Sequence, residues 1–173
     1  LASLPKEVVA PFADYNPEAS TASWALRWVA SKPNVKVVLS GMTTPEQVED
    51  NLRTFHPFRP LSLKEKELVS EVSRRIKQRT KNGCTGCAYC MPCPFGVNIP
   101  KNFHIWNELA MYGNKAKAEQ AYFKDLSEKE RADQCHECGK CEEVCPQGLS
   151  IRENLKEAAK ELSVLKETVE NPS

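Results

Sequence analysis

The sequence lacks an excess of charge of either sign. It has 24 Lys+Arg against 23 Asp+Glu in 173 residues, a formal net charge of +1 and a pI near 7.7. Nucleic-acid-binding domains usually carry a basic face and a high pI. The near balance therefore argues against a nucleic-acid partner.

Long apolar runs are also missing. The longest stretch without a charged residue, 82–100, is interrupted by glycines, prolines and four cysteines, so it cannot form a membrane-spanning helix. The first twenty residues contain Lys6, Glu7 and Asp14 and no apolar segment of a signal peptide. We expect a cytoplasmic protein with no membrane partner. Methionine occurs only at 42, 91 and 111, which predicts that a chain starting at Leu1 is a processed product or part of a longer protein.

Cysteine is absent from both ends of the chain and concentrated in two runs. The first run places Cys84, Cys87, Cys90 and Cys93 three residues apart, with Pro94 after the last. The second run has the spacing C-x2-C-x2-C-x3-C-P and consists of Cys135, Cys138, Cys141, Cys145 and Pro146. Such dense, regular runs predict a shared inorganic ligand.

Disulfides and zinc are the alternatives. Disulfides need an oxidising compartment, and nothing in the sequence indicates secretion. Eight thiolates could hold two zinc ions, since a structural zinc site uses four ligands. Zinc sites, however, usually present C-x2-C pairs, whereas each run here is a triplet followed by a fourth cysteine and a proline.

A triplet followed by Cys-Pro is typical of bacterial ferredoxins, in which three cysteines bind one [4Fe–4S] cluster and the fourth binds the other. The second run fits this spacing fully, and the first is one residue short, at Met91-Pro92. If the fourth cysteine of each run binds the cluster of the other run, the chain holds two [4Fe–4S] clusters in a crossed arrangement. One is held by Cys84, Cys87, Cys90 and Cys145 and the other by Cys135, Cys138, Cys141 and Cys93. His136 is expected to lie near a ligand without being one, because four thiolates are available.

The residues between and after the runs predict helices. One helix begins at Pro100 and stops at Gly113, a second spans 114–126, and a capping box of Ser127 and Glu130 opens a short third. A capping box of Ser150 and Glu153 predicts a last helix with Ile151, Leu155, Ala158, Ala159 and Leu162 on its apolar face. We therefore expect a helical ferredoxin-type domain over 83–167 and a tail over 168–173. This domain resembles the helical ferredoxin domains of respiratory and anaerobic oxidoreductases.

Upstream of Gly83 the pattern predicts α/β structure. A helix is expected from Asn16-Pro17-Glu18 to about Ser31, a buried strand over Val35–Ser40, and a helix from the capping box Thr44-Pro45-Glu46-Gln47 to about Thr54. A charged helix, capped by Ser62 and Glu65 and running to about Thr80, is expected to be a solvated bridge. One strand cannot be covered on both faces by this segment alone. We therefore interpret 1–60 as the end of a larger α/β domain and 61–82 as a linking helix.

The segment Pro33–Leu52, which contains Ser40-Gly41-Met42-Thr43-Thr44-Pro45-Glu46-Gln47, resembles the last strand–helix unit of the aldo/keto reductases, a (β/α)8-barrel family. In that family the loop and helix after the eighth strand hold the adenosine end of NADP(H). A helix N-terminus is a natural phosphate site, and barrel chemistry lies at the C-terminal ends of the strands. The resemblance implies that Thr43 contacts the 2′-phosphate region and that Gln47, Asp50 and Asn51 contact adenine or ribose. A basic residue used by many relatives is replaced by Thr44, which leaves the preference for NADP or NAD open.

One branch of this superfamily carries the same order of barrel, charged helix and a tail with two ferredoxin-type runs. The segments Ala88–Pro94 and Cys138–Gln147 look typical of that branch. The implied fold is mainly α: the last α-β-α unit of a (β/α)8 barrel, followed by a helical ferredoxin-like domain with two cluster loops. The family's catalytic Asp, Tyr, Lys and His lie on earlier strands. No catalytic residue is therefore expected in this chain, which should be inactive as a reductase alone.

These resemblances imply the iron–sulfur, electron-transfer part of an oxidoreductase. Two clusters would exchange single electrons with a redox partner protein, while a barrel would use NAD(P)H on a small carbonyl substrate in the full-length protein. The alternative is a metal-stapled structural or redox-sensing tail without electron transfer. A zinc adaptor for nucleic acid or protein is disfavoured, because Glu137, Glu142 and Glu143 would repel phosphate.

Overall fold

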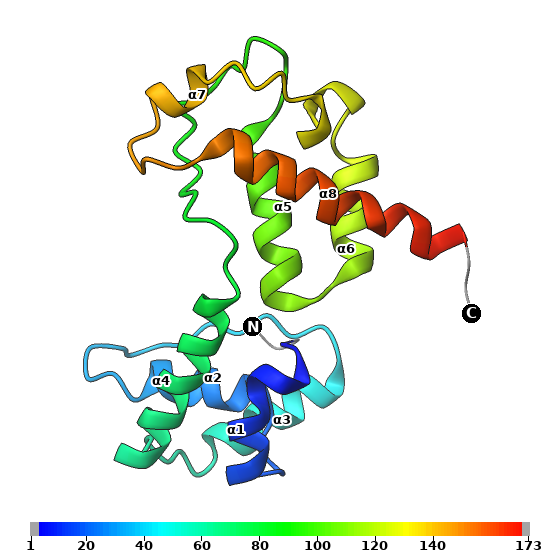
Figure 1. Cartoon of the computed structure of the whole chain (residues 1–173). Coiled ribbons are helices and arrows are strands. Elements are labelled where there is room, and N and C mark those ends of the chain that lie inside the picture. The colour runs from blue at the N-terminus through cyan, green and yellow to red at the C-terminus, as the bar shows by residue number, and fades with distance from the viewer. Residues whose placement is uncertain (1–3, 171–173) are drawn as a thin grey trace. The chain divides into compact units, whose positions relative to one another are not determined.

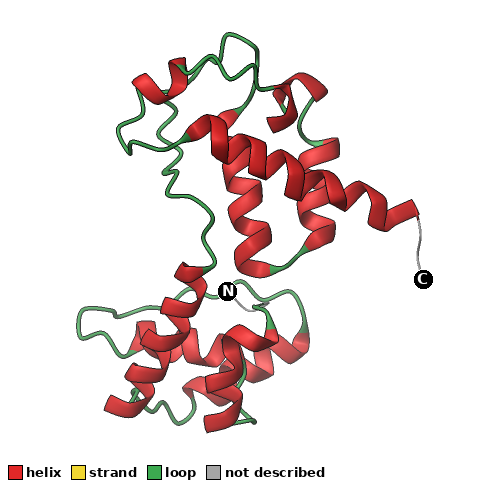
Figure 2. Ribbon diagram, in the orientation of Figure 1, coloured by secondary structure: helices red, strands yellow, loops and turns green. Residues whose placement is uncertain are grey.

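The computed structural model describes residues 4–170, and the chain divides into two compact units, 1–78 and 79–173. Regular secondary structure in the described residues is helical (Figure 1; Figure 2), apart from one isolated bridge between Phe55 and Phe58. The predicted mainly-α class is confirmed. The two units are described separately.

The first unit contains four helices around a small core. They are α1 (Lys6–Tyr15), α2 (Thr21–Ala30), α3 (Pro45–Phe55) and α4 (Leu63–Gln78). The core consists of Val8, Phe12, Trp24, Leu61 and Val72. The rings of Phe12 and Trp24 stack with centroids 4.6 Å apart. Helix α2 begins four residues later than predicted, with Ser20 rather than Asn16 as its N-cap.

No helix was predicted before Asn16, and α1 contains Pro11. A proline within a helix removes the bond from its own nitrogen to the carbonyl four residues earlier. That carbonyl belongs to Glu7, and it accepts a hydrogen bond from Nη1 of Arg75 at 3.2 Å. A side chain distant in sequence thus compensates for the missing amide.

The buried strand expected over Val35–Ser40 is not formed. The segment is non-helical and unpaired, and the side chains of Val37 and Leu39 are 75% and 92% exposed. A strand exists only by pairing its amides and carbonyls with a neighbour. No other strand is present among residues 4–170, so this part of the predicted barrel unit is wrong for the chain as described.

Helix α4 is not the solvated bridge that its charged sequence predicts. Val72 is 3% exposed in the core of the first unit, and Leu68, Val69 and Ile76 pack against that core. The unit boundary falls after Gln78. The predicted cap is confirmed: the Ser62 amide donates to Oε2 of Glu65 at 2.8 Å, and the Glu65 amide donates to the Ser62 hydroxyl at 3.3 Å.

The second unit is organised by two long helices. These are α5 (Ile99–Tyr112) and α8 (Ile151–Glu170), which pack against each other. Between them lie α6 (Lys115–Glu119), the π-helical turn η1 (Gln120–Lys124), the 3-10 turns η2 (Glu128–Glu130) and η3 (Ala132–Gln134), and the short α7 (Lys140–Glu143). The predicted tail over 168–173 starts inside α8, and residues 171–173 lie outside the described residues.

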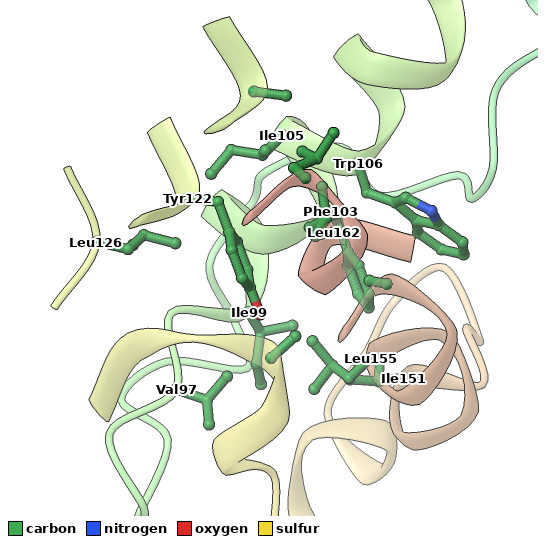
Figure 3. Close-up of a cluster of buried hydrophobic side chains, with 14 residues drawn as sticks. Val97, Ile99, Phe103, Ile105, Trp106, Tyr122, Leu126, Ile151, Leu155 and Leu162 are labelled. Atoms are coloured by element: carbon green, nitrogen blue, oxygen red, sulfur yellow. The ribbon is translucent and has the colours of Figure 1, made fainter. Parts of the chain in front are cut away.

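The core of the second unit lies between α5, α8 and the α6–η1 segment. Figure 3 shows its side chains directed toward one another. Val97, Phe103, Ala158 and Leu162 have no exposed surface. Six of the eight cysteines pack against this core, namely Cys84, Cys90, Cys93, Cys135, Cys141 and Cys145. The core therefore fixes the position of the backbone that carries both cysteine runs.

Local caps define most helix ends in this unit. Gly113 ends α5 in the left-handed conformation at φ 68°. The capping box of Ser127 and Glu130 is present, with the Ser127 amide donating to Oε2 of Glu130 at 3.0 Å. At the start of α8 the prediction of a Ser150–Glu153 box misses the observed partner. There, the Arg152 amide donates to the carboxylate of Glu142 from α7 at 2.8 Å.

Candidate metal centre

The two cysteine runs are built as a structural repeat. Each run has three cysteines, then a Cys-Pro-x-Gly turn, then a long helix that begins three residues after the glycine. The Gly96 amide donates to the Cys93 carbonyl at 3.0 Å, and the Gly148 amide donates to the Cys145 carbonyl at 3.1 Å. The repeat Cys-Pro-x-Gly was visible in the sequence and would have predicted both turns, since proline and glycine favour these turn positions.

Each loop bends through left-handed residues on both sides of its second cysteine. In the first loop these are Gly86 (φ 72°) and Ala88 (φ 62°), and in the second they are Glu137 (φ 52°) and Gly139 (φ 80°). This conformation is unfavourable for residues with a side chain. Alternating right- and left-handed residues turn successive amides toward one concave side, as in anion and iron–sulfur sites. The amide of Glu137 donates to the sulfur of Cys135 at 3.4 Å.

The first cavity, which we call site I, is lined by one of the predicted crossed sets. Its cysteines are Cys84, Cys87, Cys90 and Cys145, and the other lining residues include Ile99, Phe103 and Ile151. Its volume is about 20 Å³, which is room for about one water. Of its four cysteines, Cys87 is exposed, whereas Cys84, Cys90 and Cys145 are partly buried.

The second cavity, which we call site II, is larger, at about 330 Å³. It is lined by the other crossed set, Cys93, Cys135, Cys138 and Cys141, and also by Cys90. Tyr89, Phe95 and Val144 at its rim are 70%, 43% and 52% exposed. The fourth cysteine of each run thus lies with the three cysteines of the other run.

The pKa values of two cysteine thiols, one at each site, are raised by burial and by neighbouring thiols. Burial raises the pKa of the Cys90 thiol, and the neighbouring thiols of Cys84, Cys145 and Cys87 raise it further. Burial raises the pKa of Cys141 to about 11, with added contributions from the Glu142 carboxylate and the thiols of Cys135 and Cys90. These thiols hold their protons at neutral pH until a metal displaces them.

The described residues contain no group of three or more His, Cys, Asp or Glu side chains arranged to hold a single metal ion. The eight cysteines are therefore gathered into two shared cavities rather than into the contact distance of one ion. Next to the first run, although not in the lining of site I, Nδ2 of Asn82 is buried without a hydrogen-bond partner, while its Oδ1 accepts from the Cys84 amide at 3.0 Å. A buried donor of this kind suits a sulfur-rich group. The donor sets and loops fit iron–sulfur clusters.

His136 is engaged with an aromatic neighbour. Its ring stacks on Phe95 with centroids 4.1 Å apart, and both residues line site II. Sequence reasoning missed Phe95, although its place directly after Cys93-Pro94 marks it as part of the loop.

The residues expected to hold a nucleotide lie at the start of α3 in the first unit. Gln47 Oε1 accepts hydrogen bonds from the amide and hydroxyl of Thr43 at 2.7 and 3.3 Å. Asn51 Nδ2 donates to the Ser40 hydroxyl at 2.9 Å, and the Ser20 hydroxyl donates to Asp50. Asp50 also lines a cavity with Arg53 and Arg27. All four residues are close in space to the N-terminal half of α3 and are engaged within the chain.

Comparison with known families assigns both units. Residues 7–74 match the family model of the aldo/keto reductase family, and residues 83–149 match that of the 4Fe-4S dicluster domain. Both resemblances are confirmed. The chain carries an aldo/keto reductase segment followed by a 4Fe-4S dicluster domain. No curated protein and no solved structure matches it significantly.

The boundary between the two matched segments agrees with the division into units. The aldo/keto reductase segment ends within α4, and the 4Fe-4S dicluster domain begins one residue before Cys84. Its end at 149 precedes α8, so the helix that completes the core lies outside the matched range. None of the helices that the structure describes has the length and hydrophobicity needed to span a bilayer.

Proposed function

We propose that the second unit binds two [4Fe–4S] clusters, at sites I and II, and serves electron transfer in an iron–sulfur oxidoreductase of the aldo/keto reductase type. The observation that carries this proposal is that each of the two cavities is lined by a complete crossed set of four cysteines. When bound, such clusters accept and release single electrons. The chain's own residues supply the thiolates, direct amides toward them and exclude water on the core side.

The crossed ligand sets can be tested with paired cysteine variants. Crossing predicts that Cys87→Ala/Cys145→Ala removes ligands from site I only, so the protein purified and reconstituted without oxygen keeps about four iron per chain. The matched variant Cys87→Ala/Cys93→Ala damages both sites and should keep fewer than four. If Cys87→Ala/Cys93→Ala instead keeps more iron than Cys87→Ala/Cys145→Ala, each run binds its own cluster and the crossed arrangement is wrong.

We further propose that the aldo/keto reductase segment contributes to an NAD(P)H site in a full-length protein acting on a small carbonyl substrate. The support is the matched segment and the polar cluster of Thr43, Gln47, Asp50 and Asn51. In the full-length protein, Gln47→Ala should weaken NADP(H) binding measured by calorimetry. Glu49→Ala, a change at an exposed residue of the same helix, should leave it unchanged. Equal affinities for both variants would remove Gln47 from the site.

A structural role is the second candidate. It is favoured by the packing of six cysteines against the core of the second unit, because metal binding at such positions contributes folding free energy directly. This reading predicts that zinc supports the same fold and thermal stability as an iron–sulfur cluster. Electron transfer instead predicts reversible reduction of both clusters and exchange of electrons with a redox partner protein.

A further inference from the structure

The two cavities differ in charge. Among the described residues, no charged side chain lines site I. Site II is lined by Arg152, Lys140 and Glu137, in addition to the solvent-exposed rim described above. Two sites that share a ligand pattern are thus placed in different electrostatic surroundings.

Among these charged residues, Arg152 is held by an ion pair with Glu142. Its guanidinium lies beside the loop, with Cζ, Nε and Nη1 at 3.8 to 3.9 Å from the position that a Cβ on Gly139 would take. Its Nε and Nη2 atoms contact Oε2 of Glu142 at 2.9 and 2.8 Å, and its amide donates to Oε1 at 2.8 Å. Glu142 does not belong to the cavity lining, whereas Arg152 does. The positive end of the pair therefore faces site II.

The structural repeat provides the comparison at site I. The position of Arg152, one residue into α8, corresponds to Pro100, one residue into α5. The position of Glu142, directly after the third cysteine of its run, corresponds to Met91. Both counterparts are uncharged, so the ion pair is a property of one half of the domain.

We propose that Arg152, held in place by Glu142, raises the reduction potential at site II above that at site I, so that a single electron added to the domain settles at site II. The inference rests on the proposed function. It concerns the addition of one electron from a one-electron donor, with no bond or proton moved. Arg152 is a positioning residue, because it acts on the site through its charge and its contact with the loop.

Three features point the same way and two oppose them. The positive charges of Arg152 and Lys140 at site II favour the more negative, reduced state. Solvent access at the exposed rim favours it too, whereas the apolar lining of site I disfavours it. The carboxylate of Glu137, which also lines site II, opposes this order. A hydrogen bond from the buried, unpartnered Nδ2 of Asn82 to a sulfur at site I would also oppose it. A neutral donor acts more weakly than a charged one.

The expected size of the effect is large enough to measure. At an effective dielectric constant of about 20, removing a unit charge that lies within about 12 Å of a one-electron centre changes its equilibrium by about tenfold or more. A tenfold change corresponds to about 59 mV for a one-electron couple. Since the Arg152 side chain is 47% exposed, the shift should shrink as ionic strength rises.

The test is an anaerobic redox titration of the reconstituted full chain followed by electron paramagnetic resonance. Arg152→Gln should lower the higher of the two midpoint potentials by about 59 mV, which corresponds to a tenfold change in the equilibrium. Glu142→Gln should raise the same midpoint potential. The double variant should lie near the unaltered protein. Lys156→Gln removes an exposed charge from the same helix, outside the cavity lining, and should shift the higher midpoint by clearly less than Arg152→Gln does. In a Cys138→Ala background, which removes a site II ligand, Arg152→Gln should leave the remaining midpoint unchanged.

Several results would overturn the proposal. Shifts of the same sign in both single variants would indicate loosening of the loop rather than a charge effect. A shift of the lower midpoint alone would place the electron at site I. If Arg152→Gln loses a cluster, the charge-conserving variant Arg152→Lys should keep both the cluster and the midpoint potential of the unaltered protein. Loss of the cluster in Arg152→Lys as well would mean that Arg152 has only a structural role. An unaltered protein without two clusters would refute the proposed function instead.

Discussion

Replacing Leu155 with alanine should weaken the second unit and disturb site II together. Leu155 is 1% exposed, lies in the core of the second unit and lines the site II cavity. A leucine-to-alanine change at a fully buried position costs roughly 3–5 kcal/mol, because transfer free energy is lost and a cavity remains. The same cavity would adjoin the cysteines of site II and admit water to their core side.

Leu162→Ala is the matched control for this change. Leu162 lies two turns later on α8, is fully buried in the same core and does not line the site II cavity. Both variants should lower the midpoint of anaerobic urea unfolding, followed by circular dichroism, by similar amounts. Only Leu155→Ala should change the absorbance and the midpoint potential of a bound cluster. A cost below about 1 kcal/mol for Leu155→Ala, or equal spectral changes in both variants, would refute the packing and the cavity assigned to Leu155.

Two further predictions concern the carboxylate of Glu161 and the turn at Gly148, both in the second unit. Burial tends to raise the pKa of Glu161, but hydrogen bonds from Trp106 and Lys81 outweigh it and lower the pKa below 4.5. The ionised Glu161 therefore stabilises the fold above pH 4.5, and this stabilisation is lost as the pH falls through the lowered pKa. Lys81→Met should raise the pKa of Glu161 measured by carbon NMR, and an unchanged pKa would refute the contact between Lys81 and Glu161. Gly148 has φ +61° with open space at its Cβ position, whereas Gly83 has no positive φ. Gly148→Ala should destabilise by about 1 kcal/mol and Gly83→Ala should not, in urea unfolding, and equal effects would contradict the strain argument.

The structural features that the sequence predicted correctly depend on local chemistry. The capping boxes at Ser62 and Ser127 and the stop at Gly113 are present as expected. These features need only residues within one turn of each other. The grouping of cysteines was also accessible, because the spacing within a run and the crossing of the fourth cysteine follow a pattern that short loops can satisfy.

The parts that were missed depend on residues far apart in the chain. The apolar run Val35–Ser40 predicts a strand, yet a strand needs a partner that residues 4–170 do not provide. Helix α1 tolerates Pro11 because Arg75 satisfies the Glu7 carbonyl. Likewise, α8 begins at a contact with Glu142 rather than with its own predicted box. No local pattern contains this information.

The central claim is that sites I and II hold two [4Fe–4S] clusters. Iron and acid-labile sulfide should be measured, with an absorbance spectrum, on protein purified and reconstituted without oxygen. The account predicts about eight iron and eight sulfide per chain and a spectrum that bleaches with dithionite. About two zinc ions per chain with no sulfide, persisting through reconstitution, would contradict it and leave the cysteine loops as a structural metal site.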